Sequence, residues 1–453
     1  MIAVTESSHA DAAADDDAAL HRRAVAKASR RLIPFLMLMF ALNTIDRVNI
    51  SFAALQMNHD LGLSPAQYGF AAGLFFIAYL ICEIPSNLIL ERVGAGRWLA
   101  RIMISWGIVA IATAFVFDNY TLLTARGLLG VTEAGFAPGV MVYLMRWFPD
   151  VDRGKAMTIY LAGNPIASII GGPISGAILS MDGTWGISGW RWLFILEGIP
   201  SVIVGIATLW WLTERPQKAM WLEPDERAWL AQRMEAETAT KANTSPANFV
   251  NVFRDPATLC LTLAKFFTGI ASYGLSLWLP QIIKGFGNLS NVEIGFLTAI
   301  PSAVSIAASI LVGRHSDRTG ERIWHIAIPA FVGAAAFVWA GLAGSPFTTM
   351  VAITIAFTGL WVSNTVFWTL PTSLLSGMSA AAGLAFINSV GNLGGFVGPY
   401  FTGLIRGATT NYTWAYVMFA VVLALAGVMT VLTGMVVPAR RVAGATARAK
   451  LTD

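Results

Sequence analysis

Charged residues and cysteines are scarce in this chain of 453 residues. Only 12% of the residues are charged, whereas about a quarter are charged in ordinary soluble domains, and the mean hydropathy is +0.63. This composition excludes a soluble globular domain. The two cysteines, Cys82 and Cys260, lie in or beside apolar runs, which argues against a disulfide framework and a thiolate metal site. His59, His315 and His325 are scattered along the sequence, so we expect no metal site.

Long apolar runs dominate the sequence instead. The first run extends from about residue 32 to 55, and others lie at about 68–90, 98–117, 120–147, 156–180 and 190–213. After a polar stretch, six more lie near 257–283, 292–313, 322–343, 347–375, 380–405 and 411–437. About 20 residues of helix, each rising about 1.5 Å, cross the hydrocarbon of a bilayer. The sequence therefore predicts an all-α membrane protein with 12 transmembrane helices in two six-helix bundles.

Polar segments around the two sets of runs define the expected domains. Residues 1–31 contain four aspartates and five basic residues, and we expect a disordered cytoplasmic tail. The two bundles are expected at 32–213 and 257–437. The linker at 214–256 has the amphipathic pattern of a surface helix, and 438–453 is expected to be a second cytoplasmic tail.

Lysine and arginine are distributed unequally between the two sides of the membrane. If the amino terminus lies inside, 24 of the 30 basic residues fall in tails and loops of the inner side. The outer side receives only Arg191, Lys284 and Arg406. Because basic residues accumulate on the cytoplasmic side, we expect a multi-pass protein of the plasma membrane, the inner membrane of a bacterium, with both termini in the cytoplasm. The same distribution explains the net charge of +4 without a nucleic-acid partner.

Two motifs recur at the same spacing in the two halves. Glu91-Arg92 after the second run corresponds to Asp317-Arg318 after the eighth. Gly172-Pro173 in the fifth run corresponds to Gly398-Pro399 in the eleventh, and both offsets are 226 residues. An offset of half the chain is typical of parallel repeats related by an axis along the membrane normal. The repeat supports the division into two bundles.

Arg47, Arg126 and Lys265 are the basic residues assigned to membrane depth, and Asp46 adjoins the first of them. A charge in the hydrocarbon costs at least about 2.5 kcal/mol on insertion scales, so such groups should face the bundle interior. Helix rise puts Asp46 about 21 Å from the inner end and Arg126 about 9 Å from the outer end of their helices, which is the same level. Glu133 falls on the face of Arg126, about 10 Å deeper. We expect these groups to meet, whereas the Lys265 side chain should extend to the membrane surface.

Several motifs resemble those of the major facilitator superfamily. The stretch from Gly313 to Arg322 is similar to the signature between its helices 8 and 9. Within the superfamily, the chain resembles the anion:cation symporter family in the stretches Asp46-Arg47-Val-Asn49-Ile-Ser51, Glu83-Ile-Pro85-Ser-Asn87, Arg126 to Gly139, Trp147-Phe-Pro149 and Gly189 to Pro200. The resemblance covers about residues 30–437. It implies the major facilitator fold and a proton-coupled symporter of organic anions such as sugar acids, tartrate and aromatic carboxylates, acting as a monomer in the bilayer and not as an enzyme.

The resemblance and the side-chain chemistry give the charged residues the same roles. Arg47 and Arg126 would bind the substrate, because a guanidinium keeps its proton and matches a carboxylate with two parallel donors. Asp46 and Glu133 would carry the coupling proton, since burial and a neighbouring arginine change their protonation. No cofactor other than the proton is expected. Alternatively, Asp46 and Arg126 form a salt bridge that fixes helix packing, and Glu133 is structural.

Polar residues on other helices are candidates for binding the distal part of the substrate. They are Tyr79, Asn164, Trp368, Asn388 and Asn392. Amide groups form hydrogen bonds to a substrate and aromatic rings stack on it, although the same residue types also hold helices together in lipid.

A second group of charged residues lies in the loops. Glu91, Arg92, Asp317 and Arg318 are expected to form a latch that holds the two halves together in one conformation.

Other functions have less support in the sequence. No Gly-x-x-x-x-Gly-Lys-Ser/Thr motif occurs, so direct ATP drive is unsupported. The nearest alternative is an organic-anion uniporter or exchanger of the same fold. A membrane receptor or an integral-membrane enzyme is the alternative from another class, but we find neither a signalling domain nor a nucleophile–base constellation.

Overall fold

The computed structural model describes residues 2–242, 254–374, 378–409 and 411–436, and the expected tail at 438–453 lies outside them. The first half contains α1 (Ile2–Asp60), α2 (Pro65–Val93), α3 (Ala95–Thr113), α4 (Asn119–Glu133), α5 (Phe136–Trp147), α6 (Asp150–Leu161), α7 (Gly163–Leu179), η1 (Thr184–Gly186) and α8 (Gly189–Trp211). The second half contains α11 (Pro256–Lys284), α12 (Asn291–Thr319), α13 (Ile323–Leu342), α14 (Pro346–Phe367), α15 (Thr369–Leu374), α16 (Met378–Thr409) and α17 (Thr413–Val436). The linker contains η2 (Pro216–Lys218) and α9 (Pro224–Ala242).

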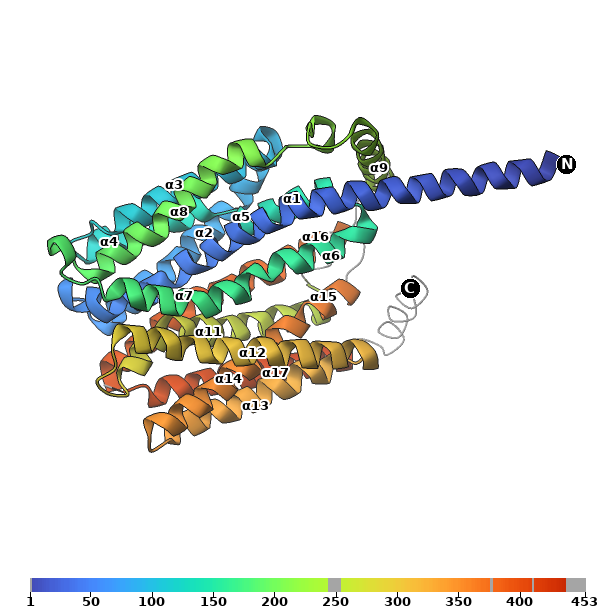
Figure 1. Cartoon of the computed structure of the whole chain (residues 1–453). Helices are drawn as coiled ribbons and strands as arrows, with labels where there is room; N and C mark the ends of the chain where they lie inside the picture. The colour runs from blue at the N-terminus through green and yellow to red at the C-terminus, as the bar shows by residue number, and fades with distance from the viewer. Residues whose placement is uncertain (1, 243–253, 375–377, 410, 437–453) are drawn as a thin grey trace.

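These helices confirm the predicted fold class. Within the described residues, ten segments are long and apolar enough to cross a membrane, and α1 and α16 cover the other two predicted spans. The predicted surface helix of the linker corresponds to α9, which lies at one end of the molecule (Figure 1). We refer to this end as the α9 end.

The internal repeat also appears at the amino termini of two helices, α2 and α12, at the other end of the molecule. Ser64 precedes α2 and accepts a hydrogen bond from the backbone of Gln67, and Ser290 precedes α12 and accepts one from Glu293. Both are capping boxes, in which the third helical side chain bonds back to the cap residue. Ser64 and Ser290 are again 226 residues apart.

Three of the predicted spans are each divided into two helices. The fourth span is divided into α4 and α5, the fifth into α6 and α7, and the tenth into α14 and α15. Irregular backbone at membrane depth is tolerated only where protein or polar side chains satisfy the freed groups. The first junction meets this condition, because Ala134 and Gly135 leave the helical conformation there, whereas Ala162 and Trp368 keep helical dihedral angles at the other two.

The two halves contact each other away from the α9 end. In this region α2 packs along α16 and α7 packs along α12. Tyr68 donates a hydrogen bond to the carbonyl oxygen of Leu277 at 2.6 Å, and Asn58 donates one to Gln281 at 3.2 Å. Within the described parts of the chain, no hydrogen bond or ion pair joins the two halves at the α9 end. The halves are thus closed against each other at the end opposite α9.

The amino-terminal segment differs from the expectation. Residues 2–31 are helical and continue into the first span as α1, which projects beyond the bundle in Figure 1. Lys27 forms an ion pair with Glu226 of α9 at 2.9 Å, and Trp229 donates a hydrogen bond to Asp17 at 2.5 Å. The interpretation of residues 1–31 as a disordered tail was wrong, because its alanine-rich sequence favours helix and its charges find partners on α9.

Candidate functional site

Arg47 and Glu133 form an ion pair between α1 and α4. Arg47 donates from Nε and Nη2 to Oε1 of Glu133, and the Nε distance is 3.1 Å. The Glu133 side chain is fully buried, whereas 22% of the Arg47 side chain is exposed. The guanidinium carbon of Arg47 lies 5.2 Å from the ring centre of Phe75 and 5.3 Å from that of Tyr79. The structure therefore places three of the predicted site residues together.

The break between α4 and α5 directly follows Glu133. Gly135 has a left-handed backbone, with φ of 87°, and Ser86 of α2 donates a hydrogen bond to the freed carbonyl oxygen of Ala134 at 2.6 Å. The indole of Trp98 donates in turn to the Ser86 hydroxyl at 3.0 Å. These contacts fix the end of α4 and hence the position of the Glu133 carboxylate.

Arg126 lies two turns before Glu133 on α4 and forms no ion pair with a carboxylate among the described residues. It is 1% exposed, and its Nε and Nη2 donate long hydrogen bonds of 3.4 Å to the backbone oxygens of Ala71 and Ala72. Its Nη1 is buried without a hydrogen-bond partner in the described structure. The guanidinium carbon lies 5.2 Å from the Phe75 ring, which Arg47 also contacts. Two guanidinium groups thus flank one aromatic ring.

Asp46 does not join this group. Its Oδ2 accepts hydrogen bonds from the indole of Trp106 at 2.7 Å and from the hydroxyl of Ser201 at 2.6 Å, on α3 and α8. The expectation that Asp46 meets Arg126 was wrong. Neighbouring residues of a helix point about 100° apart, so Asp46 faces the interior of the first half when Arg47 faces Glu133. The predicted role of Asp46 in proton coupling stays a prediction.

Asn164 lies beside the same stretch of α1. Its side-chain amide donates to the Thr44 hydroxyl at 3.3 Å, close to the start of α7. Tyr160, at the end of α6, stacks on Phe40 with ring centres 4.8 Å apart, and its hydroxyl is buried without a partner in the described structure. Both residues adjoin the break between α6 and α7.

The second half contributes a cation that sequence reasoning did not assign to a site. Nζ of Lys265 on α11 donates to Oδ1 of Asn364 on α14 at 2.5 Å and lies 4.9 Å from the ring centre of Trp368. The expected extension of Lys265 to the membrane surface was therefore wrong. The spacing of Asn364 and Trp368 on one helix face was the available signal, because such a face can hold a buried ammonium.

The predicted amides are on α16, the helix that packs against α11. Asn388 and Asn392 are partly exposed and flank Gly391 on this helix. Gly391 is close enough to Lys265 that a β-carbon there would come within 2.5 Å of the lysine Cγ. The structure thus places Trp368 against Lys265, and it places Asn388 and Asn392 on the helix whose Gly391 contacts the lysine stem.

The expected latch residues form ion pairs only within their own halves. Glu91 pairs with Arg146 at 2.6 Å, and Asp317 pairs with Arg322 at 2.6 Å. In the described parts of both halves, no ion pair links Glu91 or Arg92 to Asp317 or Arg318. A latch between the halves is not formed in this conformation.

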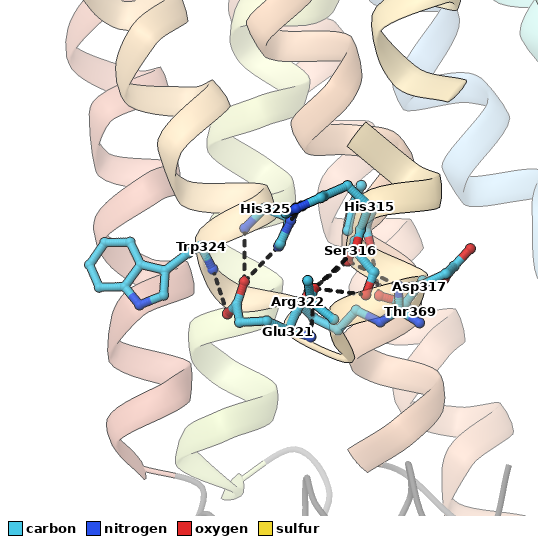
Figure 2. Close-up of polar contacts among 10 residues, drawn as sticks. His315, Ser316, Asp317, Glu321, Arg322, Trp324, His325 and Thr369 are labelled. Atoms are coloured by element: carbon cyan, nitrogen blue, oxygen red, sulfur yellow. Dashed lines mark hydrogen bonds and ion pairs between the residues drawn. The ribbon is translucent and has the colours of Figure 1, made fainter. Parts of the chain in front are cut away.

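Figure 2 shows the last turn of α12, which contains Asp317, and the start of α13. Arg322 lies against Ser316 and Asp317, while His325 lies between His315 and Glu321. His315 and His325 were interpreted as scattered, but their ring nitrogens are 2.7 Å apart. Among the described residues, no group of three or more histidine, cysteine or acidic side chains has the arrangement of a metal site.

Comparisons with known proteins agree with this architecture. A family model described as Major Facilitator Superfamily matches residues 36–399. A putative tartrate transporter of Agrobacterium vitis is 44% identical over 92% of this chain and 96% of its own. The putative metabolite transport protein NicT of Pseudomonas putida is 41% identical over 87% of this chain and 90% of its own.

A solved structure shows the same fold. The bacterial homologue of the human lysosomal transporter Spinster, in an inward-facing and occupied conformation, matches with a TM-score of 0.75. The match covers 90% of this chain and 97% of that chain at 19% identity. The family match and the relatives named as transporters show that the protein is a multi-pass membrane transporter and not an enzyme. It belongs to the major facilitator superfamily.

Proposed function

We propose that the protein imports a small organic anion together with protons, as a monomer in the inner membrane of a bacterium. The α9 end is the cytoplasmic end in this proposal, because most of the basic residues collect there. The substrate is a carboxylate such as a sugar acid, tartrate or an aromatic acid. The name of the tartrate-transporter relative supports a carboxylate substrate.

The observation that carries this proposal is the unpaired guanidinium of Arg126. An isolated buried charge is strongly unfavourable, and Nη1 of Arg126 has no partner in the described structure. A guanidinium presents a pair of parallel donors to a carboxylate. A bound carboxylate would complete the hydrogen bonds of Arg126 and use the exposed side of Arg47.

The ion pair of Arg47 and Glu133 would couple protonation to substrate binding. With Glu133 ionised, Arg47 is held by its carboxylate. A proton on the Glu133 carboxylate removes that charge and frees Arg47 to bind the substrate carboxylate. Proton and anion therefore favour each other's binding at adjacent groups.

The conformational part of the mechanism follows from the contacts between the halves. The structure is closed opposite the α9 end, where Tyr68 bonds to Leu277. We propose that the halves alternate between this arrangement and one closed at the α9 end. The charged pairs Glu91-Arg92 and Asp317-Arg318 would meet as a latch in that second arrangement.

Asp46 is proposed to take part in coupling without touching the substrate. Its carboxylate joins α1 to α3 and α8 through Trp106 and Ser201. Protonation of Asp46 would weaken its hydrogen bonds to these donors and loosen α1, the helix that carries Arg47.

Uptake by proteoliposomes tests the proposed function. A panel of labelled carboxylates is supplied with and without an inward proton gradient. We expect the gradient to drive accumulation of at least one carboxylate above equilibrium, and a protonophore to abolish it. Uptake that ignores the gradient would instead support the uniporter or exchanger.

A further inference from the structure

Lys265 is a cation held inside the second half without a carboxylate partner among the described residues. It is nine residues from Pro256, the first residue of α11, which corresponds to about 14 Å of helix. A lysine at that depth lies well inside a bilayer of about 30 Å, where an uncompensated charge is expensive. A bound anion would therefore compensate the charge of Lys265.

The surroundings of Lys265 hold its ammonium in place. Asn364 accepts one N–H of Nζ at 2.5 Å, and Trp368 lies at cation–π distance. On the α16 side, Gly391 leaves room for the lysine stem. An ammonium has three N–H donors, so the bond to Asn364 leaves donors for a ligand.

The helix of Lys265 connects this position to the arginines of the first half. Tyr273, about 12 Å farther along α11, packs on Phe76 of α2 with ring centres 4.3 Å apart. Phe76 adjoins Phe75, the ring flanked by Arg47 and Arg126. The two cationic groups therefore belong to opposite halves, and the helix of Lys265 contacts α2 beside the ring that both arginines approach.

We propose that Lys265 is a second anion-binding group and that the preferred substrate is a dicarboxylate. One carboxylate would bind Arg47 and Arg126 in the first half, and the other would bind Lys265 in the second. The inference rests on the proposed function and specifies its substrate class. A substrate with charge at both ends would join the two halves and favour their closure around it.

A matched pair of substrates tests the inference in proteoliposomes that contain the full chain. Tartrate carries two carboxylates, and threonate has a hydroxymethyl group in place of one of them. We expect the wild type to take up tartrate at least about tenfold faster at low concentration, since one well-placed charge pair contributes at least this factor. In Lys265→Gln this preference should be lost through slower tartrate uptake, with threonate uptake within about twofold of wild type.

Control variants separate charge from folding. Lys265→Arg should keep the preference for tartrate, and Lys284→Gln, at the other end of α11, should behave as wild type. If Lys265→Gln does not fold, Lys265→Met keeps the unbranched stem and is measured in the same way. A variant without the Lys265 charge that keeps the preference, or loses uptake of both compounds equally, overturns the inference. If the wild type takes up neither compound but takes up a monocarboxylate of the panel, the dicarboxylate inference fails and the proposed function stands. Uptake of no carboxylate in the panel refutes the proposed function itself.

Discussion

Both hydrogen bonds that Arg47 donates to Glu133 end on one carboxylate oxygen, Oε1. The other oxygen, Oε2, is buried without a partner in the described structure. A fully ionised buried carboxylate normally has both oxygens satisfied. A proton bound at Oε2 would therefore disturb no existing hydrogen bond of the carboxylate. In the proposed mechanism, the coupling proton would bind at Oε2 and Arg47 would then be released.

The first prediction concerns Glu133→Gln. The amide can still accept a hydrogen bond from Arg47 but cannot exchange a proton, so gradient-driven accumulation should be abolished. Counterflow of labelled against unlabelled substrate should survive, because it needs no net proton movement. Both are measured in proteoliposomes, with Glu235→Gln on α9 as control. Accumulation at the wild-type level in Glu133→Gln would refute the role of Glu133.

The second prediction concerns the break after α4. Gly135 has a left-handed backbone conformation, which alanine adopts only with strain. In Gly135→Ala the added methyl group would also overlap the hydroxyl of Ser86. The backbone strain alone costs about 1–2 kcal/mol. Gly183 is the matched control, because its φ of 78° is also left-handed but a β-carbon there meets open space. Thermal unfolding in detergent should show a larger loss of stability for Gly135→Ala than for Gly183→Ala. Equal losses of stability would contradict the proposed contact with Ser86.

The third prediction concerns the closed end of the molecule. A β-carbon on Gly295 of α12 would overlap the backbone oxygen of Gly172 of α7. Gly295→Ala should therefore disfavour the observed conformation, whereas Gly313→Ala, on the same helix, meets nothing within 4 Å. The readout is the labelling of a cysteine placed at Asn364, with a thiol reagent applied from the α9 side of the membrane.

The outcome is a comparison of labelling rates on a background without the native cysteines. Gly295→Ala should slow labelling, because fewer molecules are closed at the opposite end and open towards the reagent. Gly313→Ala should label at the wild-type rate. An equal rate in both variants would show that the contact of Gly295 with Gly172 does not govern the conformation.

The fourth prediction concerns Asp46. Ser201→Ala removes one of the two short hydrogen bonds to its carboxylate, and a buried bond to a charged group contributes about 1.5–3 kcal/mol. Ser105→Ala, which removes only bonds to its own helix, should cost much less. Thermal unfolding measures both. An equal loss of stability in Ser201→Ala and Ser105→Ala would contradict the contribution of the hydrogen bond to Asp46.

The fold was readable from the sequence because lipid imposes strong constraints. Each span must be a helix of about 20 apolar residues, and the runs could be counted directly. The internal repeat was readable from offsets such as Glu91 to Asp317, and the capping residues Ser64 and Ser290 follow the same spacing.

The site was readable only in part, since helix rise gives the depth of a residue but not its direction around the helix. Depth placed Asp46 level with Arg126, yet Asp46 faces Trp106 and its neighbour Arg47 faces the site. Contacts between distant segments were also unreadable. Neither the bond of Lys265 to Asn364 nor that of Lys27 to Glu226 follows from local sequence.

The central claim is that proton and organic anion move together through the group formed by Arg47, Arg126 and Glu133. The most direct test records labelled tartrate uptake and the signal of an entrapped pH-sensitive dye in the same proteoliposomes, with no imposed proton gradient. We predict that added tartrate acidifies the interior as it enters, and that Glu133→Gln abolishes this acidification. Tartrate entry without acidification in the wild type would contradict the account.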